Sequence, residues 1–184
     1  SNNQIYIITA QDSPNTMKEI GRLREIAFRA AGGGTGMSMD IDEYDIMDNP
    51  YKQLIVWNPE AEEILGGYRY ILGTDVRFDE HGAPILATAH MFNFSDKFLK
   101  EYMPYTVELG RSFVSLEYQN VRKNTKSIFA AMRRYGAARN RYKNFVKQSE
   151  TFDNFFCVIR QVVICAGAGY ENSVSLEFDV GKRQ

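Results

Sequence analysis

A carboxylate and an arginine near the middle of the chain have the types and spacing of a charged catalytic site. Glu108 and Arg111 are three residues apart in the segment ELGRSF, which otherwise has the pattern of one strand. A regular strand points positions i and i+3 to opposite faces. A bulge near Gly110 would bring both side chains to one face, and bulges are common beside active sites. Without a bulge, the two are an ordinary surface acid and base.

Arg24 and the acidic loop MDIDEYD form a second candidate pair. Arg24 is four residues before Phe28 and lies close to the apolar stripe of a predicted helix. Its guanidinium either reaches solvent at the edge of the stripe or is buried and needs carboxylates. We expect Asp42 and Asp45 of the loop to fold back and neutralise it. The alternative is that the acidic loop is only solvated surface.

The hydrophobic pattern predicts the elements that must position these residues. Strands and helices alternate along the chain, with apolar periods of two and of about 3.6 residues. A Ser13-Pro14 start and a glycine run at 32–34 bound the first helix. The predicted strands are 4–10, 51–58, 64–73, 84–91, 105–118, 155–166 and 173–180, and the predicted helices are 13–31, 94–103 and much of 125–147.

Length and composition indicate one domain over residues 1–184. No apolar run reaches the roughly 18 residues needed to cross a bilayer. The first residues lack the pattern of a secretory signal, so we expect a cytoplasmic protein, and peripheral contact with a membrane is compatible with that. Cys157 and Cys165 are eight residues apart, match no metal motif, and are expected to be buried thiols.

Charge is distributed unevenly although the net charge is only −1. Residues 40–63 hold eight acids and one base, whereas residues 122–147 hold nine bases and no acid. The basic block is either a solvated helix face or a docking surface for phosphates, an acidic carrier protein, a membrane or nucleic acid. The near-neutral total and the absence of a stacking aromatic platform argue against nucleic acid.

Four short motifs together resemble a known superfamily. In chain order they are REIAF with Arg24 and Phe28, DEYD with Asp42 and Asp45, GGYR with Arg69, and ELGR with Glu108 and Arg111. Over residues 20–118 the chain resembles GNAT acyltransferases of the hemolysin-like or ornithine-lipid-type branch, and more distantly the acyl-homoserine-lactone synthases.

This resemblance implies a fold and an activity. The expected fold is α/β, with a mixed, mostly antiparallel central sheet that is splayed at the long strand and flanked by helices. A V-shaped cleft would take the pantetheine arm of an acyl thioester. The expected activity is transfer of a fatty acyl group to a primary amine of an amino acid or a lipid precursor.

The chain departs from the family pattern at two places. No tryptophan follows Phe28 closely, and the only tryptophan is Trp57, so lactone synthesis is kept as the alternative activity. The segment 119–127 lacks the glycine of a phosphate-binding loop. We still expect it to bind donor phosphates at a helix N-terminus, through Arg122, Lys123, Asn124 and Lys126.

Roles for the candidate residues follow from the chemistry of a thioester, which needs positioning, a base and stabilisation of an oxyanion. Glu108 is the candidate base, directly or through a water. It could instead act electrostatically by closing one ion-pair network with Arg24, Asp45 and Arg111. Candidate substrate-binding residues are Phe28, Asp42 and Arg69.

Other chemistries have less support. His81 and His90 are weaker candidates for a base, and the acids lack the spacing of a calcium loop, so we predict no metal. We expect no permanently bound cofactor, and a donor that is acyl carrier protein or acyl-coenzyme A. Nine bases exceed the needs of one pyrophosphate, which favours the carrier protein. A non-catalytic GNAT-like binding protein is a further alternative.

Overall fold

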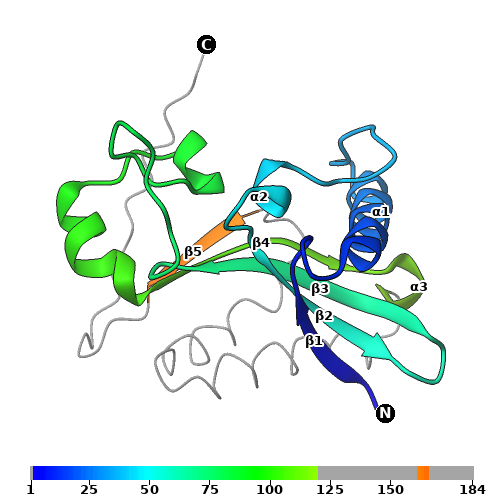
Figure 1. The fold of residues 1–184 in the computed structure, drawn as a ribbon. Helices are drawn as coiled ribbons and strands as arrows, with labels where there is room; N and C mark the ends of the chain where they lie inside the picture. The colour runs from blue at the N-terminus through cyan, green and yellow to red at the C-terminus, as the bar shows by residue number, and fades with distance from the viewer. Residues whose placement is uncertain (1, 120–160, 166–184) are drawn as a thin grey trace.

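An antiparallel sheet forms the centre of the computed structural model, which describes residues 2–119 and the backbone of 161–165 (Figure 1). The spatial order is β1-β2-β3-β4-β5, and every neighbouring pair is antiparallel. The strands are β1 (Gln4–Ile8), β2 (Lys52–Asn58), β3 (Glu63–Leu72), β4 (Thr106–Val114) and β5 (Gln161–Cys165). The predicted α/β fold with a mostly antiparallel sheet is confirmed, and the described strands include no parallel pair.

The hairpin of β2 and β3 is the predicted one. Leu54 lies opposite Tyr68 and Ile55 opposite Gly67 in the register. The side chain of Asn58 accepts hydrogen bonds from the backbone of Glu60 and Ala61, which closes the turn. Side chains along these strands point alternately to the two faces of the sheet, and both faces are buried.

One face of the sheet is a hydrophobic cluster of strand residues. Its buried members come from β2, β3 and β4, and they are Leu54, Val56, Leu65, Tyr68, Tyr70, Val107 and Leu109. The opposite face carries a second cluster at one end of the sheet and the polar residues of the candidate site beside it.

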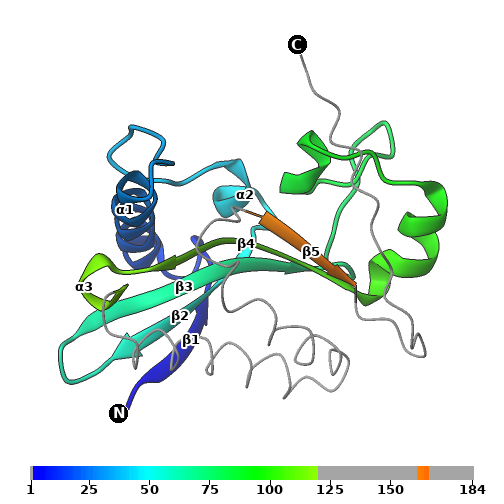
Figure 2. The ribbon, with the colours of Figure 1, turned by 180° about the vertical axis from the view of Figure 1, so that it is seen from behind.

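Helix α1 (Pro14–Ala30) covers this opposite face, as Figures 1 and 2 show from two sides. Its apolar stripe is Met17, Ile20 and Ala27, and these residues pack against Ile55 of β2 and Phe113 of β4. Pro14 occupies the first turn as predicted, although the Ser13 side chain makes no capping hydrogen bond. Within the described residues, no helix has the length and apolar character to span a bilayer.

The connection from β3 to β4 differs from the prediction. The segment 84–91, expected as a strand, contains a 3₁₀ turn, η1 (Ala87–His90), and one isolated bridge between Phe78 and Pro84. Hydrogen bonds to the distant residues Tyr51 and Glu108 hold this turn. The alternation of apolar residues along the segment could not predict these contacts. The predicted helix at 94–103 is present as a π-helix, η2 (Phe98–Tyr102), followed by a 3₁₀ turn, η3 (Met103–Tyr105).

Strand β4 is shorter than predicted. It ends at Val114. The next residue, Ser115, makes two hydrogen bonds to β3, from its backbone N–H to the carbonyl of Leu65 and from its hydroxyl to the carbonyl of Ile64. A short helix, α3 (Leu116–Gln119), follows. The described β5 falls inside the predicted strand 155–166, whereas the predicted helix at 125–147 and strand at 173–180 lie outside the described residues, as does Cys157.

Candidate active site

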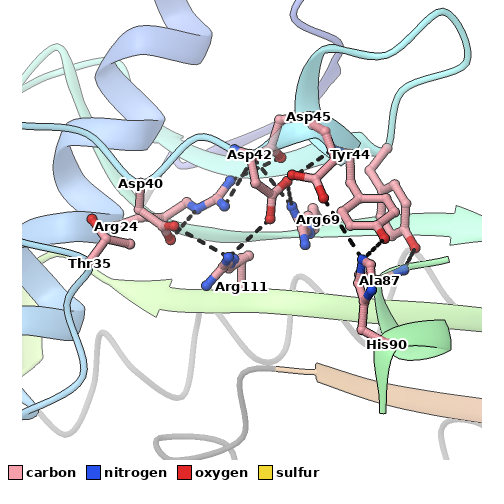
Figure 3. Close-up of polar contacts among 12 residues, drawn as sticks. Arg24, Thr35, Asp40, Asp42, Tyr44, Asp45, Arg69, Ala87, His90 and Arg111 are labelled. Carbon is pink, nitrogen blue, oxygen red and sulfur yellow. Dashed lines mark hydrogen bonds and ion pairs between the residues drawn. The ribbon is translucent and has the colours of Figure 1, made fainter. Parts of the chain in front are cut away.

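Three arginines and three aspartates form an ion-pair network on the sheet face that carries α1 and the short helix α2 (Glu43–Ile46) (Figure 3). The arginines come from α1, β3 and β4. Asp40 and Asp42 come from the loop that leads into α2, and Asp45 is in α2 itself. The members of this network are Arg24, Arg69, Arg111, Asp40, Asp42 and Asp45.

Arg24 is fully buried, with 0% of its side chain exposed. Its two terminal nitrogens donate to the two carboxylate oxygens of Asp45 at 3.2 Å each, and its Nε donates to Asp40 at 3.3 Å. The prediction that the acidic loop folds back onto Arg24 is confirmed for Asp45, but the second partner is Asp40 and not the expected Asp42. Asp42 instead pairs with Arg69 and Arg111. A buried guanidinium requires such partners, because an unpaired charge there would cost several kcal/mol.

Gly21 allows the acidic loop to approach α1 closely. A Cβ at this position would lie 2.6 Å from the side chain of Ile41. The carbonyl oxygen of Gly21 accepts a hydrogen bond from the backbone N–H of Asp40 at 3.0 Å. This contact brings Asp40 within reach of Arg24.

The same aspartates cap α2. The side chain of Asp42 accepts from the backbone N–H of Tyr44, and Asp45 accepts from the backbone N–H of Asp42, both at 3.1 Å. This reciprocal arrangement is a capping box. The network therefore determines the position of the α2 turn as well as neutralising the arginines.

Arg69 lies under α2 with 1% of its side chain exposed. It forms ion pairs with Asp42 and Asp45 and sits against the rings of Tyr44 and Tyr51, at 5.6 and 5.0 Å from the ring centroids. Burial acts to raise the pKa of Asp42, but its hydrogen bond to Arg69 and the charges of the arginines outweigh it and hold that pKa well below its usual range. Asp42 therefore stays ionised.

The predicted bulge on β4 is present. Gly67 pairs with Phe113 and Arg69 with Gly110, so β4 has one more residue than β3 between these two pairs. Arg111 occupies the bulge with φ of 52°. Its Nη2 is 3.0 Å from Asp42 and 3.5 Å from Asp40, while its buried Nε has no hydrogen-bond partner in the described part of the chain.

Glu108 points to the same side of the sheet as Arg111, with 1% of its residue surface exposed. Its two carboxylate oxygens accept hydrogen bonds from the hydroxyls of Tyr51 and Thr88, each at 2.6 Å. Burial, and then the negative charge of Glu108, raises the pKa of Tyr51 well above its usual range, so Tyr51 stays a donor. Glu108, which we expected inside the ion-pair network, adjoins it through Tyr51.

Among the described residues, the pairing between β4 and β5 reaches Gly110, next to the bulge. It extends from Thr106 opposite Cys165 to Gly110 opposite Gln161. The rest of β4 lies beside β3 alone among the described strands. The described β5 therefore pairs with the part of β4 that carries Glu108, which lies opposite Val163.

Some predicted site residues have other surroundings. Phe28 packs at the edge of the α1 cluster. His90 is hydrogen-bonded to Tyr44, and His81 is exposed in a loop next to Glu80. The predicted phosphate-binding residues Arg122, Lys123, Asn124 and Lys126 lie outside the described residues. Among the residues that are described, no group of three or more potential ligands could hold a metal ion.

The sequence analysis missed several polar residues that complete the site. Tyr51 directly precedes β2 and is two residues before Gln53, which shares a strand face with Ile55. A glutamine between apolar positions of a strand was a usable signal. Gln53 donates to Asp45 at 2.9 Å. No local pattern pointed to Thr88, because its role depends on a turn that the sequence did not predict.

The chain belongs to the Acetyltransferase (GNAT) domain family, whose model matches residues 23–128. It is 79% identical over 130 residues to a glycine N(alpha)-acyltransferase of Phocaeicola vulgatus, a match that covers 71% of this chain and 40% of the relative. A glycine N(alpha)-acyltransferase of Bacteroides thetaiotaomicron is 80% identical over 130 residues, covering 71% of this chain and 39% of the relative. The matched part of the chain thus spans about two fifths of these relatives. No solved structure matches.

Proposed function

We propose that the chain is the acyl-transferring part of an N-acyltransferase that moves a fatty acyl group from a thioester to the α-amine of glycine. The observation that carries this proposal is the identity of about 80% over 130 residues to two proteins named for that reaction. The bulge of β4, with Glu108 and Arg111 on one face, supplies charged groups suited to it.

In this reaction the neutral amine attacks the carbonyl carbon of the thioester. A C–N bond forms, the amine loses a proton, and the C–S bond breaks so that the thiol leaves with a proton. The protein has to take the proton, hold the reactants together and stabilise the oxyanion. No cofactor beyond the donor is required.

Glu108 would receive the proton. Its carboxylate is hydrogen-bonded by Tyr51 and Thr88, so the proton would travel through one of these hydroxyls or through a water. Arg111 would stabilise the oxyanion, because it occupies the bulge of β4 and its Nε is a donor without a hydrogen-bond partner within the described residues. The remaining ion pairs would hold both residues in place.

The donor in this proposal is an acyl carrier protein or acyl-coenzyme A. The sequence of residues 122–147, with nine bases and no acid, favours the broad acidic face of a carrier protein. Lactone synthesis has less support, because both relatives are named for glycine acylation and no tryptophan closely follows Phe28.

The test is transfer of a fatty acyl group to glycine by the wild-type chain and by Glu108→Gln, with both donors and with mass spectrometry of the product. If Glu108 is the base, transfer falls by about 10²-fold or more while thermal stability is kept. The exposed Glu117→Gln serves as the control and should leave transfer unchanged.

Two results would contradict these assignments. A collapse of thermal stability with unchanged turnover per folded molecule would make Glu108 a structural residue. A wild-type chain that binds acyl thioesters but forms no N-acylglycine would be a non-catalytic GNAT-like protein, and formation of acyl-homoserine lactone would identify the alternative activity.

A further inference from the structure

The carboxylate of Glu108 is held by two hydroxyl groups from distant parts of the chain. Tyr51 directly precedes β2, and its hydroxyl donates to Oε1 at 2.6 Å. Thr88 is in the η1 turn, and its hydroxyl donates to Oε2 at 2.6 Å. All three residues are buried, with at most 1% of each residue surface exposed. We call the hydroxyls of Tyr51 and Thr88 the hydroxyl clamp.

The hydroxyl clamp fixes an orientation that the Glu108 side chain would not have by itself. The last torsion of a glutamate side chain is broad, because it joins a tetrahedral carbon to a planar carboxylate. One hydrogen bond to each oxygen, from two different segments, determines the plane of the carboxylate. Both donors are neutral, so they orient Glu108 without adding a positive charge. This arrangement suits a group that has to accept a proton from a fixed direction.

Tyr51 is itself fixed at its hydroxyl and at its ring. The hydroxyl oxygen accepts a hydrogen bond from the backbone N–H of Ala87 at 3.0 Å. The ring lies edge-on to Tyr44, with the centroids 5.7 Å apart, and its centroid is 5.0 Å from the guanidinium carbon of Arg69. Burial, and then the charge of Glu108, raises the pKa of Tyr51 well above its usual range, so the hydroxyl keeps the proton that it donates. Through Arg69, Tyr51 thereby connects Glu108 to the ion-pair network.

The η1 turn supports both halves of the hydroxyl clamp. It carries Thr88, which binds Glu108 directly, and Ala87, whose N–H holds the hydroxyl of Tyr51. The carbonyl oxygen of Thr88 accepts hydrogen bonds from the backbone N–H groups of Met91 and Phe92, at 2.9 and 3.0 Å, which closes the turn. Two neighbouring residues of one short turn therefore determine the orientation of a carboxylate on β4.

We propose that Tyr51 and Thr88 are positioning residues of the reaction and that they act through Glu108. They hold its carboxylate in the orientation in which it takes the proton, and the η1 turn is the element that sets this orientation. The inference rests on the proposed N-acyltransferase function, with Glu108 as the base. The alternative is that the two hydroxyls only satisfy a buried carboxylate, which would affect folding and not a step of the reaction.

The test measures transfer of a fatty acyl group to glycine by the full chain and by two variants that each remove one hydroxyl, Tyr51→Phe and Thr88→Val. In each variant kcat per folded molecule should fall about 10- to 100-fold, as expected for a lost hydrogen bond to a charged group. The KM for glycine and for the donor should stay unchanged. Thr88→Ser keeps a hydroxyl and should restore most of kcat. The exposed Tyr105→Phe is the control and should leave kcat unchanged.

The same two substitutions are then made in a Glu108→Gln chain. A residue that acts only through Glu108 has no further effect once Glu108 is replaced, so Glu108→Gln and its double variants should have the same kcat. A hydroxyl that only supports the fold would lower the free energy of unfolding and leave kcat per folded molecule unchanged. That result, or a fall in kcat by the same factor in both backgrounds, would overturn the positioning role.

The outcomes for wild type and Glu108→Gln separate this inference from the proposed function. A wild-type chain that forms no N-acylglycine overturns the N-acyltransferase, and the positioning role with it. Transfer that falls in Glu108→Gln but not in Tyr51→Phe or Thr88→Val overturns the positioning role alone. Transfer that is unchanged in Glu108→Gln overturns the base and its positioning residues and leaves the N-acyltransferase standing.

Discussion

Replacing Asp45 by asparagine should strongly destabilise the protein. The network holds three arginines and three aspartates, so its formal charge is zero. Asp45→Asn keeps the shape but leaves one positive charge in excess, at a position with 0% exposure. It also weakens the contacts of Asp45 with Arg24, Arg69 and Gln53.

The expected loss in the free energy of unfolding is about 3–5 kcal/mol, which is typical when one partner of a buried ion pair is removed. This is a large part of the roughly 5–15 kcal/mol by which a domain is stable. Arg24→Gln together with Asp45→Asn restores the charge balance. The double variant should therefore be more stable than the sum of the two single losses predicts.

The assay is urea unfolding followed by the fluorescence of Trp57, the only tryptophan. The control is Glu19→Gln on α1, the helix that carries Arg24. It breaks the exposed pair with Arg22 and should cost no more than about 1 kcal/mol. A loss for Asp45→Asn as small as that of the control would refute the reasoning. Additive losses in the double variant would show that Arg24 and Asp45 are not coupled.

Two further predictions concern other contacts. Gly67→Ala should lower the free energy of unfolding by about 1–3 kcal/mol in the same assay, because the added Cβ would lie 2.3 Å from the backbone oxygen of Leu54. An unchanged free energy of unfolding would mean that β2 and β3 lie further apart at this position. A hydrogen bond from the side chain of Thr35, helped by further donors and opposed by burial, lowers the pKa of Glu25 from 4.5 to about 2. As the pH falls, Glu25 is protonated in the unfolded chain before it is protonated in the folded one. The stabilisation of the fold by ionised Glu25 is therefore present above about pH 4.5 and lost as the pH falls toward 2. Glu25→Gln should flatten that part of the curve of unfolding free energy against pH, and an unchanged slope would contradict the assignment.

Local patterns predicted the elements whose side chains alternate regularly. The first helix, the β2–β3 hairpin and the bulge near Gly110 were all predicted, because Pro14, the turn after Asn58 and the i, i+3 pair of Glu108 and Arg111 are local signals. The η1 turn was not predicted. Its hydrogen bonds to Tyr51 and Glu108 join segments that are 20 or more residues apart.

By itself, the sequence determined which charged side chains stand among apolar positions, since Arg24 lies close to the apolar stripe of a helix and Arg69 and Glu108 lie within apolar strands. Only the tertiary structure decided their partners. Three arginines and a run of acids allow many pairings, and the choice depends on how closely the acidic loop packs on α1 at Gly21. The same packing brought hydroxyls to Glu108, because a strand pattern tells which side a carboxylate faces and not which distant side chains meet it there.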